Sequence, residues 1–361
     1  MNLFEKILKT IRAHALLDAS TPALLMVSGG SDSTALAYLS ARLREEGFCG
    51  PLAMVHVNHN LRGEASDADA AFVQRLALGL EIPLTVVDVD VQAQAEAEHG
   101  NIEDIGRRER YAAAHSALSH LCLEHDVPTG QGRILVAHTV DDRIENFYMR
   151  SIVGTGPGGF RSMLYRNGNV VRPLLDCNRE ELREYIRARH LEDLFCTRNA
   201  DDSLWCEDAT NAHTDRFRTF VRHEIVPLAK TKNPNLNETL ARTMNLIADE
   251  DDMLDEMANE LVSQHVMWLE PVEEGCILSP WLAAERLPLQ RRVAIKVLED
   301  MLGADTRLES ATVDAVLAAF ANGKPVSGYV ANIQGNLAVS ANRNGVRIEP
   351  MAIYRMRRNR V

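Results

Sequence analysis

Residues 24–36, LLMVSGGSDSTAL, constrain the fold of this chain more than any other stretch. The apolar run 23–27 predicts a buried strand, and apolar residues at helical spacing from 34 to about 46 predict a helix. Residues 28–33 between them form a short turn with two adjacent glycines. Such a turn at a helix N-terminus presents unpaired backbone N–H groups to an anion, so we predict a phosphate-binding loop.

The chemistry of this loop separates it from two common phosphate loops. It has neither the lysine of GxxxxGK[ST] nor the spacing of GxGxxG. It carries Asp32 instead, and a carboxylate beside a phosphate is repulsive unless a cation lies between them. Asp32 therefore implies Mg²⁺. The alternative is an ordinary Gly-Ser turn in which Asp32 or Ser33 caps the helix.

Composition limits the class of protein. A chain of 361 residues is long enough for two domains with a sizeable core. The net charge of −12 argues against general coating of nucleic acid but permits a local basic patch. The six cysteines include no CxxC pair, as expected for reduced thiols without a zinc or iron–sulfur site. No apolar run approaches membrane-spanning length, so we expect a cytoplasmic protein with no membrane partner. The sequence leaves the oligomeric state open, with a homodimer among the permitted assemblies.

Short apolar strands alternate with amphipathic helices through the first two hundred residues. Further strands are predicted at 52–57, 84–89 and 134–137, and helices at 66–80, 102–120 and 141–152. This alternation predicts an α/β fold with a doubly wound parallel sheet. Ligands of such sheets bind at the carboxyl ends of the strands, which is where the polar motifs of this chain lie.

Two of these motifs leave alternatives open. His56 and His59 end the second strand and could bind a metal, although an ordinary strand end is the favoured interpretation. Arg107 and Arg110 are three residues apart and share a helix face. They could clamp a phosphate or a polyanion, or belong to a solvated face paired with nearby glutamates.

The richest motif follows the fourth strand, where His138 precedes Asp141, Asp142 and Glu145. We expect Asp141 and Glu145 to share a helix face, with Asp142 beside them. Acids gathered in this way could hold Mg²⁺, hold a cationic amine or supply a general base. The alternative is an acid-rich first turn that stabilises the helix dipole.

Seven motifs occur in order along the chain, and together they resemble the tRNA(Ile)-lysidine synthetases, a family of PP-loop ATP pyrophosphatases. They are SGGSDS, HVNHNLR, NIExxxRxxRY, AHxxDDxxE, VGTGPGGF, RPLL and EDATNxxxxxFRxxVRxxxxP, the last spanning 207–227. The resemblance implies a ligase that adenylates the wobble cytidine of an isoleucine tRNA with a CAU anticodon and then joins L-lysine to it, forming lysidine.

The resemblance also assigns roles to residues of this chain. It implies ATP binding by Ser28, Gly29, Gly30, Ser31, Asp32 and Ser33, with Mg²⁺ held near Asp32 through the phosphates. It implies catalytic roles for Asp32, Arg107, His138, Asp142 and Glu145. We expect Arg110, Arg218 and Arg222 to bind tRNA.

Four positions depart from the family pattern. Arg143 stands where glutamine is usual, Asn146 where threonine is usual, Val153 where arginine is usual and Thr219 where asparagine is usual. The loop is intact, so these departures bear on the substrate more than on ATP. The alternatives are another PP-loop ATP pyrophosphatase, acting on a different tRNA base or a small molecule, and a non-catalytic nucleotide-binding module. The acids after the fourth strand argue against the module, because ATP binding alone does not require them.

The sequence predicts a boundary near Pro227. Residues 1–227 would form the PP-loop catalytic domain, and 228–361 a C-terminal tRNA-binding region that is helical to about 322 and then rich in strands. Helices are predicted at 240–262, 290–302 and 310–322, and strands within 326–349 around an Asn344-Gly345 turn. The arginine-rich tail, with Arg355, Arg357, Arg358 and Arg360, is predicted to be mobile.

Overall fold

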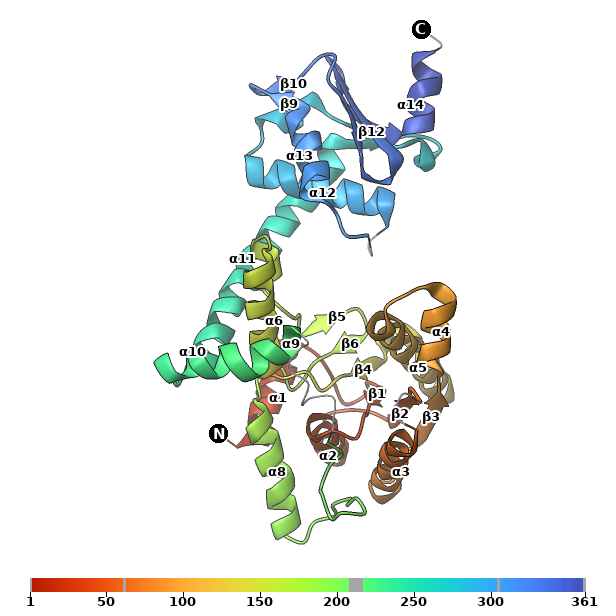
Figure 1. Ribbon diagram of the computed structural model, residues 1–361, viewed down its shortest axis with the longest axis vertical. Helices are drawn as coiled ribbons and strands as arrows, with labels where there is room; N and C mark the ends of the chain where they lie inside the picture. The colour runs from red at the N-terminus through yellow and green to blue at the C-terminus, as the bar shows by residue number, and fades with distance from the viewer. Residues whose placement is uncertain (1, 61–62, 208–216, 304–305, 360–361) are drawn as a thin grey trace. The chain divides into compact units, whose positions relative to one another are not determined.

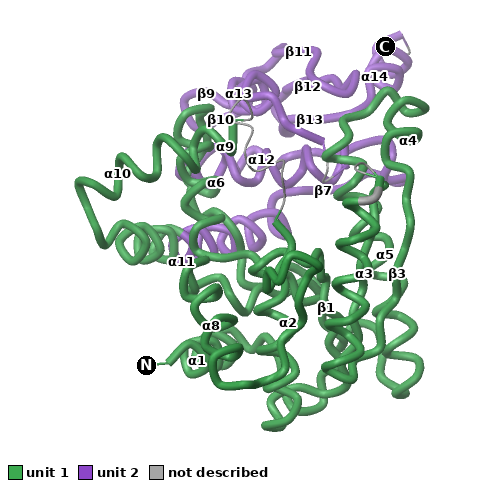
Figure 2. The backbone as a smooth tube through the Cα atoms, turned by 60° about the horizontal axis from the view of Figure 1, so that its bottom comes forward, with its two compact units in different colours: residues 1–247 green, residues 248–361 purple. Residues whose placement is uncertain are grey.

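The computed structural model describes residues 2–60, 63–207, 217–303 and 306–359 (Figure 1). It divides into two compact units, residues 1–247 and 248–361 (Figure 2). The predicted boundary at 227 lies in helix α10 (Val226–Lys232), which belongs to the first unit. The division itself falls within helix α11 (Leu236–His265).

A six-stranded sheet forms the centre of the first unit. Its strands lie in the order β3 (Leu84–Asp88), β2 (Leu52–Asn58), β1 (Ala23–Met26), β4 (Arg133–Leu135), β6 (Val170–Val171) and β5 (Arg166–Asn167). Neighbouring strands are parallel except β5, which is antiparallel to β6. The chain builds β1, β2 and β3 outward in one direction and then places β4 on the other side of β1. The predicted doubly wound sheet is confirmed, and its switch point lies between β1 and β4.

Helices cover both faces of this sheet, which is why its strands read as nearly continuous apolar runs. Successive residues of β1 point to opposite faces, with Leu25 in one hydrophobic core and Leu24 in another. The core around Leu25 includes α1 (Leu3–Ala13), α2 (Ser31–Glu45), α3 (Glu64–Gly79) and α8 (Arg179–Leu191). The core around Leu24 includes α5 (Ile102–Glu124).

The remaining elements of the first unit are shorter. They are α4 (Val91–Glu98), a 3₁₀ turn (Thr129–Gln131), α6 (Val140–Val153), α7 (Pro157–Phe160), α9 (Phe217–Phe220) and a π-helical turn (Val221–Ile225). Two differences from the sequence predictions affect the site. Helix α2 begins at Ser31 rather than at Thr34, so half of the loop forms its first turn. Helix α8 was not predicted.

The second unit has an antiparallel sheet. Its order is β11 (Val330–Ile333), β12 (Leu337–Asn342), β13 (Gly345–Pro350), β8 (Cys276–Leu278) and β7 (Val266–Trp268). Helices α12 (Leu287–Leu302) and α13 (Ser310–Ala318) share its hydrophobic core. Short 3₁₀ turns (Val272–Glu274, Pro280–Ala284 and Gln334–Asn336) and a two-stranded ribbon, β9 (Phe320–Ala321) with β10 (Lys324–Pro325), complete it. The hairpin of β12 and β13 turns at the predicted Asn344-Gly345 signal.

The predicted mobile tail is instead helix α14 (Met351–Arg358) over its described part. Met351 is buried, and Arg357 Nη2 lies 2.5 Å from Oε1 of Glu349, whose side chain is fully buried. These two contacts attach the helix to β13, whereas Arg360 lies outside the described residues. Among the helices that the structure describes, none is both long and apolar enough to cross a membrane.

Candidate active site

The predicted phosphate loop follows β1 and has a fixed conformation. Gly29 has a φ of +92°, in the region that favours glycine, and a Cβ there would lie 2.9 Å from Cys206 Sγ. The Gly29 carbonyl accepts a hydrogen bond from Thr34 Oγ1 at 3.0 Å and one from Cys206 N–H at 2.9 Å. Ser33 Oγ accepts from Ser28 N–H at 3.2 Å. The loop is therefore held by its own side chains and by the backbone of Cys206.

The N-terminus of α2 opens directly from this loop. Its N-cap residue, Gly30, has no side chain to cap the helix. The N–H groups of Ser31, Asp32 and Ser33 occupy the first turn, where no preceding helical carbonyl is available to accept from them. These donors and the positive end of the helix dipole together favour an anion at this point.

The acids of the second motif lie where β4 leads into α6, beside the end of β1. Asp142 Oδ2 accepts from the backbone N–H of Thr139 at 2.8 Å and from Thr139 Oγ1 at 3.0 Å. This capping box fixes the first turn of α6. One oxygen of Asp142 thus stabilises the helix start, while the other accepts from Arg179 Nη2 and Arg218 Nη2.

We call Asp32, Asp142 and Glu145 the acid cluster, and Arg179 joins all three carboxylates. Arg179 Nε lies 3.3 Å from Asp32 Oδ2, Nη2 lies 2.6 Å from Asp142 Oδ1, and Nη1 lies 2.7 Å from Glu145 Oε1. Burial raises the pKa of Asp32; the Arg179 charge opposes this effect, and the nearby Asp142 carboxylate adds to it. One guanidinium therefore neutralises carboxylates from two different motifs.

Two more arginines contact the acid cluster. Arg218 Nε lies 2.9 Å from Glu145 Oε2, and Arg222 Nε lies 2.8 Å from Glu145 Oε1. Burial alone would raise the pKa of Glu145, but the hydrogen bonds and charges of Arg222 and Arg179 lower it to about 2. Both arginines were predicted to bind RNA as part of a basic patch, and the structure places them against acids.

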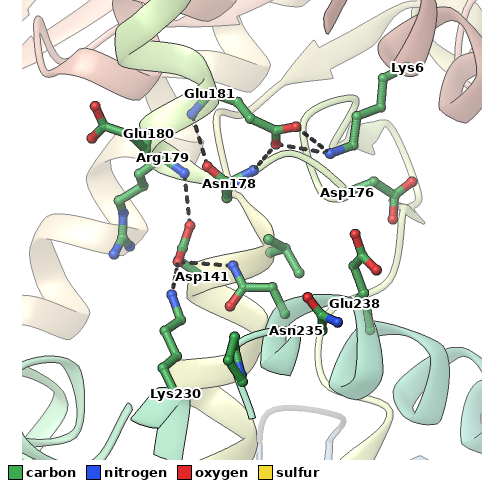
Figure 3. Close-up of a pocket in the computed structure, with 14 residues that line it drawn as sticks. Lys6, Asp141, Asp176, Asn178, Arg179, Glu180, Glu181, Lys230, Asn235 and Glu238 are labelled. Carbon is green, nitrogen blue, oxygen red and sulfur yellow. Dashed lines mark hydrogen bonds and ion pairs between the residues drawn. The ribbon is translucent and has the colours of Figure 1, made fainter. Parts of the chain in front are cut away.

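Asp141 lies one turn before Glu145 on α6, as expected, but its side chain has other partners. Its Oδ2 accepts from the backbone N–H of Arg179 at 2.8 Å, and its Oδ1 lies 3.7 Å from Lys230 Nζ. Asp141 lines a cavity of about 640 Å³ with Lys6, Asp176 and Glu238 among the other lining residues (Figure 3). The Arg179 side chain points away from Asp141 in this view. The adjacent acids Asp141 and Asp142 of α6 therefore have different partners.

His138 follows β4 and is held by Arg172, the arginine of the RPLL motif. Arg172 Nε donates to His138 Nδ1 at 3.2 Å, which assigns the proton of a neutral ring to Nε2. Burial lowers the pKa of His138 to about 4; the Asp142 charge opposes this, and Arg172, Arg218 and Arg107 reinforce it. His138 is therefore a neutral hydrogen-bond donor near pH 7.

The arginines of α5 lie in different surroundings. The exposed Arg107 guanidinium lies 5.1 Å from the centre of the Tyr111 ring. Arg110 Nε donates to the Gly106 carbonyl at 3.2 Å, and its charge helps to lower the pKa of His59, after burial. Arg107 adds to the lowering of the His138 pKa, and Arg110 to that of His59.

The first histidine of the second-strand motif has a partner within the sheet. His56 is buried, and its Nδ1 lies 2.8 Å from the Val27 carbonyl, which joins β2 to the end of β1. No group of three or more potential histidine, cysteine or acidic metal ligands occurs within the described part of the chain. Two parts of the predicted motifs, Leu61-Arg62 and residues 208–216, lie outside it.

The departure at Arg143 lies in the interior, away from the acid cluster. This side chain is 1% exposed, donates to Asn245 Oδ1 at 2.7 Å and lies 3.3 Å from Tyr165 Oη. Asn146 donates to Ser162 Oγ at 3.4 Å, while Val153 is exposed at the end of α6. The arginine at 143 therefore connects α6 to α11 and does not add a charge to the site.

Sequence reasoning missed Arg172, Arg179 and Arg183 as site residues. Arg183 Nε lies 3.4 Å from Ser31 Oγ, one helical turn beyond Arg179 on α8. A local signal for this helix was present, because Asn178 and Glu181 form a capping box. The pairing of α8 with the loop is non-local, and no sequence motif announced it.

A glycine-containing loop at a helix N-terminus beside a carboxylate–arginine cluster, at the switch point of a doubly wound sheet, is typical of nucleotide-using α/β enzymes. The family model of the PP-loop domain matches residues 3–229. This chain belongs to the PP-loop family, and the match supports ATP as its nucleotide.

Curated relatives add a more specific similarity. The tRNA(Ile)-lysidine synthase of Dehalococcoides mccartyi is 32% identical over 327 residues, which cover 87% of this chain and 64% of that protein. The enzyme of the same name from Geobacter sulfurreducens is 33% identical, covering 86% of this chain and 63% of its own length. That of Porphyromonas gingivalis W83 is 36% identical over 67% of this chain and 48% of its own. The chain thus spans less than two thirds of the length of these relatives.

Proposed function

We propose that this chain ligates free L-lysine to the wobble cytidine of an isoleucine tRNA with a CAU anticodon, converting ATP to AMP and pyrophosphate. The observation that carries the proposal is the similarity to enzymes named tRNA(Ile)-lysidine synthase over most of this chain. The acid cluster supports it, because a ligase that uses an amine needs carboxylates next to its nucleotide site.

In the first step, the cytosine carbonyl oxygen attacks the α-phosphorus of ATP, and pyrophosphate leaves. The uncapped N-terminus of α2 would bind phosphate oxygens, and Arg183 lies at the same loop. Asp32 fits a magnesium ion, because its Oδ1 accepts only from Ser31 Oγ among the contacts seen, and Asp142 is near enough to raise its pKa. When bound, Mg²⁺ would neutralise phosphate charge, with Asp32 holding it.

In the second step, the deprotonated ε-amine of lysine attacks the activated ring carbon, and AMP leaves with the former carbonyl oxygen. Glu145 remains ionised at any physiological pH because its pKa is about 2, so it suits recognition of an ammonium group. With its proton on Nε2, His138 can donate a hydrogen bond to the oxygen that departs.

An RNA substrate of this kind presents its target base without a duplex to open. The bases of an anticodon loop are unpaired, so little unpairing energy is required. We assign RNA contacts to the exposed Arg107 and Arg110, to Arg218 and Arg222 once they leave the acids, and to the C-terminal region beyond residue 228. A tRNA substrate also places the reaction in the cytoplasm. A homodimer is compatible with this proposal.

The test uses purified protein, Mg²⁺-ATP and radiolabelled lysine with two transcripts of the same anticodon. We expect label in an isoleucine tRNA carrying CAU and little in the methionine elongator tRNA, because discrimination must use bases outside the anticodon. Pyrophosphate release measured in parallel separates the alternatives. Release with another RNA or small molecule, without label in the isoleucine transcript, would favour a different PP-loop ATP pyrophosphatase.

A further inference from the structure

The acid cluster is paired with a positively charged side chain of the protein itself, Arg179. Arg179 directs Nε, Nη1 and Nη2 to Asp32, Glu145 and Asp142 respectively, and its side chain is only 20% exposed. Arg218 also donates to Asp142 Oδ1 and to Glu145 Oε2, and Arg222 donates to both oxygens of Glu145. Both oxygens of Glu145 and Oδ1 of Asp142 thus pair with guanidinium groups.

This arrangement conflicts with the binding of a lysine ammonium at the same carboxylates. Glu145 accepts at both oxygens from three guanidinium groups, and Asp142 Oδ1 accepts from two. An additional cation would find no free acceptor and would be repelled by the arginines. For lysine to bind, at least Arg179 must exchange its partners.

The alternative partner for Arg179 lies within reach. Its Nε already contacts Asp32 in the first turn of α2, and Arg183 contacts the neighbouring Ser31. Residues 179 and 183 are one turn apart on α8, so both guanidinium groups face the predicted phosphate position. Guanidinium pairs with phosphate oxygens in the same bidentate manner as with carboxylates.

We propose that Arg179 blocks the lysine site of the free enzyme and transfers to the phosphates of ATP, so that nucleotide binding opens the acid cluster to lysine. This inference rests on the proposed function and adds an order of binding to it. Arg218 and Arg222 would likewise leave the carboxylates and pair with RNA phosphates. Lysine would then be admitted only after the anionic substrates, when an activated cytidine is present to receive it.

The exchange predicts a measurable coupling. Binding of radiolabelled lysine is measured by equilibrium dialysis with the full chain alone, with a magnesium complex of α,β-methylene ATP, with tRNA, and with both. Because coupling free energies are reciprocal, we expect the analogue to tighten lysine binding by about tenfold or more, and lysine to tighten analogue binding equally. Equal lysine affinity with and without the analogue would overturn the proposal.

Variants identify the residue responsible. Arg179→Gln should bind lysine without the analogue about as tightly as the wild type does with it, so that the coupling disappears. Arg187→Gln is the matched control, because Arg187 lies two turns along α8 and pairs with Glu180. It should retain the full coupling. An Arg179→Gln protein that is folded by circular dichroism and keeps wild-type coupling would contradict the assignment to Arg179.

If Arg179→Gln fails to fold, the coupling between lysine and the ATP analogue in the wild type still tests the proposal. The conservative variant Arg179→Lys then replaces Arg179→Gln in the comparison. Lysine labelling of the isoleucine transcript is measured on the same preparation. Labelling without coupling refutes the blocking role of Arg179 alone. Absence of labelling together with absence of lysine binding under every condition refutes the proposed function itself.

Discussion

Asp32 is the residue where the loop and the acid cluster meet. It sits in the first turn of α2, and its carboxylate contacts Ser31 and Arg179. If Asp32 holds Mg²⁺ on the ATP phosphates, Asp32→Asn should reduce pyrophosphate release on the order of a hundredfold while the fold stays intact. Asp104→Asn, in the exposed first turn of α5, is the matched control. Near-normal release by Asp32→Asn would exclude this role.

Glu145 gives a prediction for stability against pH. Its folded-state pKa of about 2 lies below the ordinary value of 4.5, so its ion pairs stabilise the fold fully above about pH 4.5. This contribution is lost as the pH falls through about 2. Glu145→Gln leaves Arg179 and Arg222 without their carboxylate, so we expect a loss of roughly 3 kcal/mol at pH 7.

Urea denaturation at pH 7, 5 and 3.5 measures this effect. The difference between wild type and Glu145→Gln should shrink as the pH falls below 4.5. Glu180→Gln, which removes an exposed carboxylate paired with Arg187, should change stability by less than about 1 kcal/mol. A difference that does not depend on pH would show that the ion pairs of Glu145 are not its source.

The candidate acids stand out in the sequence, but the partners that the structure gives them do not. Asp142 and Glu145 stand out because acids gather at one helix start, and Asp32 stands out beside a phosphate loop. The role of Arg179 is not visible in the sequence, because even its nearest partner along the chain, Glu145, is 34 residues away, with α7, β5 and β6 between them. Arg218 and Arg222 were predicted to contact RNA because a sequence shows charge without showing the opposite charge that meets it.

At the scale of elements, the loop between β1 and α2 depends on the backbone of Gly29. Alanine there would adopt a φ of +92° and place its Cβ 2.9 Å from Cys206 Sγ. The strain amounts to about 1–3 kcal/mol, so Gly29→Ala should weaken ATP binding by roughly tenfold or more. Isothermal titration with ATP measures this, and Gly130→Ala, with open space around it, is the control.

A second variant separates the two causes of that loss. Gly29→Ala with Cys206→Ala removes the sulfur atom but keeps the positive φ. We expect this double variant to remain impaired, because the backbone strain persists. Full recovery of ATP binding would show that contact with Cys206, and not backbone conformation, explains the requirement for glycine.

Elements with strong periodic patterns were predicted well, and those defined by tertiary contacts were not. The strands of the parallel sheet are buried on both faces, so β1 and β2 read as apolar runs. Two-residue strands such as β6 carry too little pattern to be seen. Helix α2 begins earlier than its apolar pattern because its first turn consists of the polar residues Ser31, Asp32 and Ser33. Helix α14 is fixed by an ion pair between Arg357 and the fully buried Glu349.

At the scale of the whole molecule, the arrangement of the sheet explains why motifs far apart in sequence form one site. The order of strands brings the ends of β1 and β4 together, so residues 28–33 and 138–145 meet at the switch point. The alternation of strands and helices predicted a parallel sheet with these motifs at the carboxyl ends of its strands, but not the order of the strands. The length of the first unit was not predictable in the same way, because α10 and the start of α11 attach through contacts that involve the buried Val226, Leu236 and Met244.

Net charge gives the last prediction, which concerns tRNA binding by the whole chain. The protein carries a net charge of −12, so most of its surface should repel RNA and binding must rest on a few arginines. Each phosphate contact releases counterions, so the logarithm of the affinity should fall steeply and linearly with the logarithm of the salt concentration. Filter binding of the isoleucine transcript at KCl concentrations from about 50 to about 300 mM measures this slope.

Matched variants on one helix identify the contacts that produce the slope. Arg107→Gln and Arg110→Gln should each reduce the slope by about 1, because each removes one phosphate contact. Arg108→Gln should leave it unchanged, since Arg108 lies between them in sequence but pairs with Glu98 at 2.6 Å and with Glu109. A flat salt response of the wild type, or an equal effect of all three substitutions, would show that RNA does not bind through this face of α5.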